Sequence, residues 1–596
     1  MVLGALGACS GDSNPGTQIN GGNTGGTETG TAGAGGGTGA TSGSDGFGGT
    51  LIDLGNCGPE TCAELGWACG YTVNNCGDVI DCAEEGLTCA ADQSCVGGID
   101  GPTECVASNA ETCELCAAIP DCSAAPQPTR LSGRVISPGR DDADTGNQVA
   151  VPNALVYILR NNDASVLPPI STGIPTGGTS CDRCEDQDLG PVLAGAVTDA
   201  AGNFVIEGNV PVGTEFLLVV KAGKFRRAVA QTLAPAAACT DAALPIALPD
   251  NPARLPRNSA DGIAANIPRI AVTTGQIDAM ECVFEKMGIA QTEFGNPGAD
   301  GTAAQRIHLY RGINQDGNPA GARIDDATPA DGALYSELGR LQSYDMIVAD
   351  CEGLGWDDTF AERNASGANV REYVNRGGRM FASHLSFSWL HENDTTAFNP
   401  DTPIATGLAA AGTWATGINT ATTGSGKISI ERPNASPRIQ NFADWMQNEG
   451  ITTPPANNFT ILEPRSQSTG LGEFSEEFVH LEDGTERTQQ FSFNTPYGAP
   501  EEAACGRVAY SGFHVSVGGG NSPFADATFP VHCTGDLTDQ EKVLLYMLFD
   551  LGACVGEPPI APPCVPVTCS EVGARCGFAP DGCGNILDCG ACRPPA

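Results

Sequence analysis

The stretch GGRMFASHLSFSWLHEND, residues 377–394, decides the fold of the larger part of this chain. Its apolar run after two glycines predicts a buried strand that leads into a turn, with His384 where the strand ends. The preceding residues, NVREYVN, predict a helix. Helix, glycine turn and strand therefore follow one another here.

The same alternation continues along the chain on both sides of this stretch. PRIAVTTG (268–275) predicts a buried strand, and QIDAMECVFEKMG (276–288) predicts an amphipathic helix. Further segments of the pattern are RIHLYRG (306–312), ALYSELGRLQSYDMIVADCEG (333–353), CGRVAYSGFHVSV (505–517) and LTDQEKVLLYMLFDLGA (537–553). Such alternation predicts an α/β domain with a mostly parallel sheet covered on both faces. We place this domain at residues 266–553, with an insertion near residues 392–500.

Three of the predicted strands carry polar residues where they end. Parallel strands end at one edge of the sheet, and ligands of such folds bind beyond the carboxyl ends of the strands. The segments YDMIVADCEG (344–353), GGRMFASH (377–384) and GRVAYSGFH (506–514) all end there. We therefore expect one group of candidate site residues at this edge: Asp350, Cys351, Glu352, Ser383, His384 and His514.

The order of these motifs resembles the class I glutamine-amidotransferase-like superfold. The trehalose-utilisation type is the most similar branch, because it shares a GG-strand-His segment and a late strand that leads to a histidine, here RVAYSGFH (507–514). The resemblance covers residues 266–553 apart from the insertion. It implies a flavodoxin-like arrangement of the sheet.

The same segments depart from an active amidotransferase. Those enzymes place a cysteine nucleophile at a strained turn flanked by glycines. Here the turn is FASHLSF (381–387), with Ser383 and His384 and no glycine, and His514 is followed by VSV. No complete Cys–His–Glu triad can be found, which argues against glutaminase chemistry.

Several alternatives stay open for this edge of the sheet. His384 and His514 could act as acid and base, or as metal ligands with Asp350 or Glu352. A Ser383–His514–Asp350 triad is conceivable, although a GxSxG motif is lacking. Both histidines could also be hydrogen-bonded strand-end residues without chemistry. The sequence requires no cofactor, and we assign no metal site.

Residues 128–232 have a different pattern, with short β-branched runs separated by Gly, Pro and Asn turns. TDAAGNF (198–204) predicts a turn in which Gly202 has a positive φ between two strands. The order of GRV, NALVYI, TDAAGNFVI and VPVGTEFLLVV resembles carboxypeptidase-regulatory-like (transthyretin-like) β-sandwich domains. The resemblance implies an accessory domain, followed by a linker at 233–265.

Two cysteine-rich segments share one spacing. CGPETCAELGWACGYTVNNCGDVIDC (57–82) and CVPVTCSEVGARCGFAPDGCGNILDC (564–589) place their cysteines identically, which indicates a repeat. Each is too short for a hydrophobic core, so we predict disulfide-rich modules at 51–124 and 554–596. They resemble a module of secreted and surface proteins of myxobacteria. The disulfide candidates are Cys57, Cys62, Cys69, Cys76, Cys82, Cys181, Cys184, Cys505, Cys533, Cys564, Cys569, Cys576, Cys583, Cys589 and Cys592.

Some pairings can be suggested outside these modules. CDRC (181–184) is expected to form a structural bridge, with Cys239 as a candidate partner. Cys505 and Cys533 are expected to pair, because they flank the late strand. Cys282 with Cys351 is a further suggestion.

The start of the chain indicates its location. LGAC at residues 6–9 resembles the bacterial lipobox, which implies a lipid on Cys9 and 1–9 as the remnant of a signal peptide. Because only eight residues precede Cys9, we expect the true start of the signal to lie upstream. Residues 10–50 are mostly Gly, Thr, Ser and Ala, which predicts a disordered tether.

Composition narrows the possible partners. The chain has 71 acidic and 30 basic residues, a formal charge of −41, and no cluster of Lys or Arg, so nucleic acid and anionic membrane surfaces are unlikely partners. Twenty-six cysteines indicate an oxidising compartment. Contact with a membrane is expected only through the lipid anchor.

These observations predict a multidomain lipoprotein at the outer membrane or cell surface. It would combine disulfide-rich modules at both ends, a β-sandwich and an α/β domain, in a binding or structural role toward glycan or other surface proteins. The alternative is an extracellular hydrolase or related enzyme that acts on carbohydrate through the group around His384 and His514.

Overall fold

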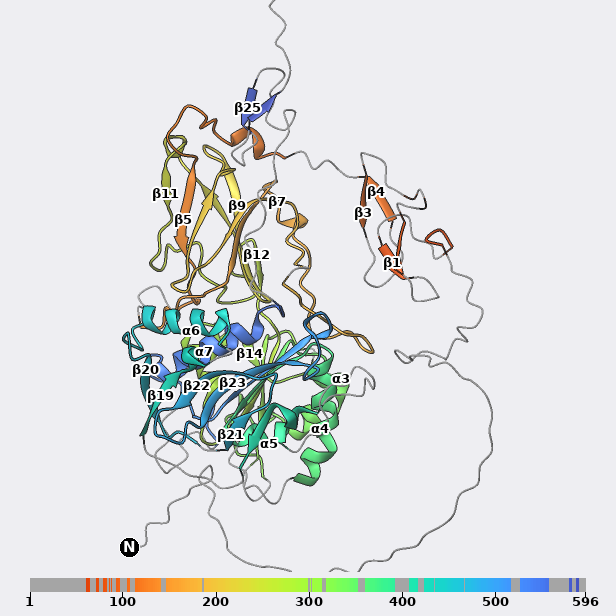
Figure 1. The fold of residues 1–596 in the computed structure, drawn as a ribbon, viewed down its shortest axis with the longest axis vertical. Coiled ribbons are helices and arrows are strands. Elements are labelled where there is room, and N and C mark those ends of the chain that lie inside the picture. Colours follow the sequence, from red (N-terminus) through yellow and green to blue (C-terminus); the bar gives the residue numbers. More distant parts are fainter. Residues whose placement is uncertain are drawn as a thin grey trace, which may run out of the picture.

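A computed structural model (Figure 1) describes most of residues 113–556, together with short segments within 61–107 and 578–588. Within 113–556 the gaps are 141–145, 185–186, 299–300, 302, 314–317, 352–359, 392–406, 416–422, 433–434, 466 and 516–525. The predictions for Cys9, the tether and Glu352 therefore lie outside the described residues. The same holds for Cys57, Cys69, Cys76, Cys564, Cys569, Cys576, Cys583, Cys589 and Cys592.

The two cysteine repeats contain matching hairpins. Each pairs two antiparallel three-residue strands at equivalent positions of the repeat, β1 (Tyr71–Val73) with β2 (Val79–Asp81) and β25 (Phe578–Pro580) with β26 (Ile586–Asp588). In the first repeat Cys62 and Cys82 form a disulfide. A second hairpin follows it, β3 (Gln93–Val96) with β4 (Glu104–Ala107).

Residues 130–266 form two sheets, which we call the β-unit. One sheet has the strand order β12-β10-β9-β6-β7 and the other has the order β11-β5-β8. The strands are β5 (Arg130–Arg134), β6 (Leu155–Leu159), β7 (Val192–Val197), β8 (Asn203–Glu207), β9 (Glu215–Ala222), β10 (Phe225–Thr232), β11 (Asp241–Ala243) and β12 (Ala264–Asn266).

Two details of the β-unit bear on the sequence predictions. Gly202 has a φ of +77° in the turn between β7 and β8, as the TDAAGNF pattern predicts. That turn joins the two sheets instead of closing a hairpin, because β7 pairs with β6 and β8 pairs with β5. The expected linker at 233–265 contains β11, which pairs in parallel with β5.

A ten-stranded mixed sheet forms the larger unit, in the order β14-β15-β13-β16-β17-β24-β23-β22-β19-β20. Its strands are β13 (Ile270–Thr274), β14 (Phe294–Gly295), β15 (Ile307–Arg311), β16 (Met346–Ala349), β17 (Arg379–Ser383), β19 (Thr423–Ile428), β20 (Asn458–Leu462), β22 (Glu476–Leu481), β23 (Thr488–Thr495) and β24 (Gly506–Ser511). The strands from β14 to β24 pair in parallel, and the remaining pairings are antiparallel. The expected insertion near 392–500 therefore extends the sheet and covers what would otherwise be an open edge at β24.

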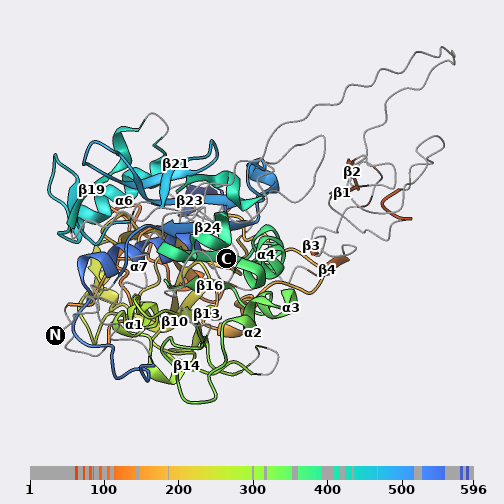
Figure 2. The same cartoon turned by 90° about the horizontal axis from the view of Figure 1, so that it is seen from below.

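Helices cover both faces of the central strands. They are α1 (Met280–Lys286), α2 (Gly332–Tyr335), α3 (Leu338–Leu341), α4 (Phe360–Asn375), α5 (Ser388–His391), α6 (Pro437–Asn448) and α7 (Asp539–Gly552). Val348 and Phe381 pack on the side of α1, α6 and α7, and their neighbours Ile347 and Met380 pack on the side of α2–α4. This alternation is the period of two that a strand buried on both faces requires. Figure 2 shows α7 and α4 on opposite sides of β16 and β24.

The β-unit packs on the face that α1, α6 and α7 cover. Figure 1 shows α6 and α7 between the β-unit and the ten-stranded sheet, and one apolar cluster includes residues of both units. The indole Nε1 of Trp445 in α6 donates to the Ala150 carbonyl, 3.0 Å away. The Lys224 ammonium lies 2.6 Å from the Asp345 carboxylate. The β-unit is thus part of a common core.

Two disulfides also connect the two units, Cys181–Cys505 and Cys184–Cys554. The other pairs of residues 113–556 do not cross between the units; they are Cys113–Cys116, Cys122–Cys239 and, within the larger unit, Cys282–Cys533. The expected pairings of Cys505 with Cys533, of Cys282 with Cys351 and of CDRC with Cys239 are therefore wrong. The whole length of β24 separates Cys505, before the strand, from Cys533, beyond its carboxyl end.

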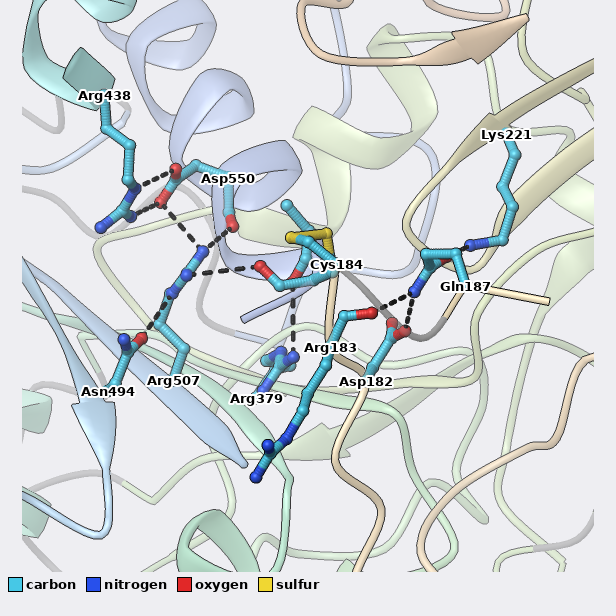
Figure 3. The surroundings of a disulfide bond; sticks show 12 residues. Asp182, Arg183, Cys184, Gln187, Lys221, Arg379, Arg438, Asn494, Arg507 and Asp550 are labelled. Carbon is cyan, nitrogen blue, oxygen red and sulfur yellow. Dashed lines mark hydrogen bonds and ion pairs between the residues drawn. A yellow bond between two sulfur atoms is a disulfide. The ribbon is translucent and has the colours of Figure 1, made fainter. Parts of the chain in front are cut away.

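Buried arginines surround the Cys184–Cys554 bridge (Figure 3). Asp550, near the end of α7, accepts a hydrogen bond 3.1 Å long from Nε of Arg438. Arg507 donates to the carbonyls of Asp550 and Cys554, at 2.7 and 3.4 Å. Arg379 donates to the Cys505 carbonyl, 2.6 Å away. Cations at the carboxyl end of a helix are favourable, and here they also hold the segments that carry the two bridges.

No helix in the described part of the chain has both the length and the apolar composition needed to cross a bilayer.

Candidate functional site

Three neighbouring parallel strands of the sheet end beside one another and bring polar residues together. Asp350 follows β16, Ser383 is the last residue of β17, and His514 lies shortly after β24. His384 begins a 3₁₀ turn, His384–Phe387, that leads directly into α5. All four side chains are buried. We call this edge the carboxyl edge.

The structure brings the two histidines into contact. Nδ1 of His384 lies 3.1 Å from Nε2 of His514, and the rings meet edge to face with centroids 4.9 Å apart. Sγ of Cys351 lies 3.4 Å from the same Nδ1. The pair is therefore within the distance that proton transfer requires.

His384 has an unusual backbone conformation. Its φ is +39°, in the left-handed region that residues with a Cβ rarely adopt. In α/β hydrolases a strained strand-to-helix turn of this kind exposes the nucleophile. Here the residue in that conformation is a histidine. Strain of this kind persists only where the surrounding structure fixes the residue.

Asp278 holds the residues next to both histidines. One of its carboxylate oxygens accepts a hydrogen bond from the Ser383 hydroxyl, and the other accepts one from the Val515 N–H, 2.9 Å away. Ser383 precedes His384, and Val515 follows His514. Sequence reasoning missed Asp278, although its position just after β13 was a usable signal, because β13 ends at the same edge.

Two charged residues face the other side of His514. Oε2 of Glu463 lies 3.7 Å from Nδ1 of His514, and Nη2 of Arg465 lies 3.5 Å from it. The two charges also pair with each other at 2.9 Å. Sequence reasoning missed both residues, because they come from the segment expected to be an insertion.

The surroundings set the charge of this group. Burial lowers the pKa of His384 well below its usual range, and the nearby His514 and Arg465 lower it further, against a smaller opposite effect of the Gln467 side chain. The close approach of His514 lowers the pKa of Glu463, against the effect of burial. The site therefore combines a neutral His384 with a charged Glu463 at neutral pH.

Asp350 is also fully buried, and among the described residues no hydrogen bond joins its carboxyl group to either histidine. One of its oxygens accepts a hydrogen bond from the Gly275 N–H, 3.0 Å away. Burial and the charges of Glu281 and Asp278 raise its pKa well above the usual range. The conceivable Ser383–His514–Asp350 triad is not formed, because the Ser383 hydroxyl donates to Asp278.

A metal would need a different set of donors. The ligand atoms of Cys351, His384 and His514 lie within 4.8 Å of one another, which is a spacing that a metal site can have. Cys351 is disulfide-bonded, however, so it offers no thiolate. The donor set present does not fit a thiolate–imidazole metal site.

Several buried polar atoms here have no hydrogen-bond partner within the part of the chain that the structure describes. They are Nε2 of His384, both amide atoms of Gln467, Oγ of Ser468, the hydroxyl of Tyr510 and Oδ1 of Asp350. Each such atom costs about 1–3 kcal/mol when nothing pairs with it. Buried polar atoms are normally paired, so ordered water or a polar ligand would be needed to pair these.

A second histidine–carboxylate pair lies on the far side of α1. Nε2 of His532 is 2.6 Å from Oε1 of Glu281, and the neighbouring residues Cys282 and Cys533 form a disulfide. Burial alone lowers the pKa of His532, but the hydrogen bond and the charge of Glu281 outweigh it and raise the pKa.

This pair should make stability depend on pH. Because the folded pKa of His532 is raised, its contribution is complete below the unfolded value of about 6.5 and is lost as the pH rises through the folded value. We expect the loss of stability in His532→Gln to shrink between about pH 5 and pH 9 in urea unfolding. Above about pH 7 His308→Gln is the control, since burial lowers the pKa of His308 to about 4, so this residue is neutral there in both the folded and the unfolded chain. A loss in His532→Gln that stays constant with pH would contradict this expectation.

Comparisons of the chain with models of protein families, with curated proteins and with solved structures found no match.

Proposed function

We propose that this protein is an extracytoplasmic hydrolase or related enzyme that acts on carbohydrate, with the His384–His514 pair as its proton-transferring group. The observation that carries the proposal is the contact of the two buried imidazoles at 3.1 Å, with Nε2 of His384 unpaired among the described residues. Carbohydrate as the substrate class rests on the resemblance to the trehalose-utilisation type.

The chemistry would begin at His384. A neutral imidazole can take a proton from a water or hydroxyl group as that oxygen attacks, and it can return the proton to the leaving oxygen. Burial favours this role, because it keeps His384 neutral before the reaction. His514 can share the positive charge that His384 acquires, since the two nitrogens are in hydrogen-bond contact.

The finer assignment of the fold belongs to the same proposal. The parallel pairing from β14 to β24 and the strand–His384–helix turn support an amidotransferase-like, flavodoxin-like domain. The two sheets of the β-unit support a transthyretin-like sandwich. The disulfides support an oxidising compartment, and a lipid on Cys9 would place the protein at a membrane or cell surface.

The test is turnover of a panel of glycosides by the full chain with its disulfides intact. His384→Asn and His514→Asn should each lower the rate by a factor of about 10²–10⁴. His308→Gln is the matched control, because His308 is a buried histidine of β15 whose Nδ1 contacts the Tyr344 hydroxyl at 2.8 Å. Absence of turnover in the wild type, or equal rates in His384→Asn, would refute the proposal.

A binding or structural role is the second candidate. The complete burial of both imidazoles and the disulfide at Cys351 favour it, because they restrict access and remove a nucleophile. In that case glycans would raise the thermal stability of the wild type without being converted, and His384→Asn would abolish the increase.

A further inference from the structure

The two histidines have unequal surroundings, which decides where their protons lie. A neutral imidazole carries one N–H, so each ring can donate from one nitrogen and accept at the other. The contact joins Nδ1 of His384 to Nε2 of His514. Either His384 donates to His514, or His514 donates to His384.

The sulfur of Cys351 favours the first arrangement. A cysteine in a disulfide has no S–H, so Sγ can only accept a hydrogen bond. It lies 3.4 Å from Nδ1 of His384, which suits a proton on that nitrogen. Nε2 of His384 is then left with a lone pair; it has no hydrogen-bond partner among the described residues, although the Gln467 side chain interacts with this ring.

Glu463 favours the same arrangement at the other ring. A carboxylate is only an acceptor, so its approach to Nδ1 of His514 at 3.7 Å suits a proton there. Arg465 approaches the same nitrogen from 3.5 Å, and its Nη2, which carries two N–H groups, also donates to Glu463 at 2.9 Å, so the contacts of Cys351 decide between the two arrangements. With its proton on Nδ1, His514 presents the lone pair of Nε2 to His384.

We propose that Glu463, His514 and His384 form a proton relay that leaves Nε2 of His384 as the basic atom, and that Asp278 is the positioning residue that aligns the two rings. The catalytic purpose of the relay rests on the proposed function, whereas its test needs no turnover. Glu463 orients His514, and Nε2 of His514 accepts a hydrogen bond from Nδ1 of His384. When Nε2 of His384 takes up a proton, the resulting positive charge is shared between the two histidine rings and is balanced by the Glu463 carboxylate. No bond other than N–H and O–H changes in this step.

Asp278 is suited to the positioning role by the two residues that it holds. Its carboxylate binds the Ser383 hydroxyl and the Val515 N–H, each directly next to one histidine and on a different strand end. Asparagine would keep only one acceptor oxygen there. The backbone at His384 is strained, so loss of one of these contacts should let the rings separate.

The relay can be tested without a substrate, by ¹⁵N NMR of the histidine rings in the full chain with its disulfides intact. The chain has six histidines, and the spectra of His384→Asn and His514→Asn assign the two signals. We expect the proton of each ring to lie on Nδ1, and His384 to be neutral at neutral pH. In Asp278→Asn the pKa of His384 should move toward the ordinary value of about 6.5.

Two further variants make the result decisive. Asp345→Asn is the matched control, because Asp345 is a buried carboxylate at the opposite edge that also accepts backbone N–H bonds, and it should leave both rings unchanged. Glu463→Gln serves if Asp278→Asn does not fold, since the Glu463 side chain is 26% exposed. It should populate the other tautomer of His514.

A proton on Nε2 of His384 in the wild type would overturn the relay, and so would an unchanged His384 in both Asp278→Asn and Glu463→Gln. Neither result depends on turnover. An intact relay in a protein that converts no glycoside would instead refute the proposed function.

Discussion

Asp550→Asn is expected to lower the free energy of unfolding by about 3 kcal/mol. Removing one partner of a buried ion pair leaves an uncompensated charge, which costs roughly 3–5 kcal/mol. We expect the lower end of that range, because Arg438 keeps a second contact to Glu476 at 2.5 Å. Arg507 is the residue most affected, since it is almost fully buried and keeps only neutral partners close to its guanidinium.

At acidic pH the wild type and Asp550→Asn should have similar free energies of unfolding. Burial alone would raise the pKa of Asp550, but Arg438 and Arg507 outweigh it and lower the pKa. A lowered folded pKa means that the stabilisation is complete above the unfolded value of about 3.9 and is lost as the pH falls through the folded value. Urea unfolding followed by tryptophan fluorescence should show the two proteins converging in acid.

The control for this experiment is Asp539→Asn on the same helix. Asp539 is exposed in the first turn of α7, where a charge contributes only about 0.3–1 kcal/mol. A loss in Asp550→Asn no larger than that of the control would show that the arginine cluster is held by its carbonyl contacts alone.

The second large effect is expected from loss of both bridges that start in the CDRC segment. Replacing Cys181, Cys184, Cys505 and Cys554 by alanine together should lower the free energy of unfolding by about 3–5 kcal/mol, because the unfolded chain is then no longer closed into a long loop. The two bridges span 324 and 370 residues. They therefore restrict almost the same loop, and either one closes it.

Removing a single bridge should thus have less than half of this effect. The pairs Cys181→Ala with Cys505→Ala and Cys184→Ala with Cys554→Ala test this non-additivity in urea. The bridge between Cys113 and Cys116, which closes a loop of three residues, provides the control and should matter little. Equal losses from one bridge and from both would contradict the shared-loop explanation.

Much of the larger unit could be predicted from local sequence. The apolar runs at 270–274, 346–349 and 379–383 are strands in the structure, and the amphipathic pattern before 288 contains α1. These segments are buried on both faces, so their composition alone marks them. Because parallel strands end at the same edge of a sheet, the sequence also predicted that these strands end together.

The antiparallel half of the sheet gave no comparable signal. β19 has the sequence TGSGKI, which lacks an apolar alternation because only two of its residues are buried and one of these is a glycine. Glu463 and Arg465 follow β20 and reach His514 only because β20, β19, β22 and β23 continue the sheet. The disulfide pairing was also beyond the sequence, because Cys181 and Cys184 meet partners that depend on how the two units pack.

The interlocking bridges change what a protease could do to this protein. Any single cut between residues 122 and 554 falls within the span of Cys122–Cys239 or of Cys184–Cys554, so the two fragments stay covalently joined. A chain nicked once on its surface would keep its core together and release no piece. A single cut by a secreted protease would therefore cleave the backbone without separating the two fragments.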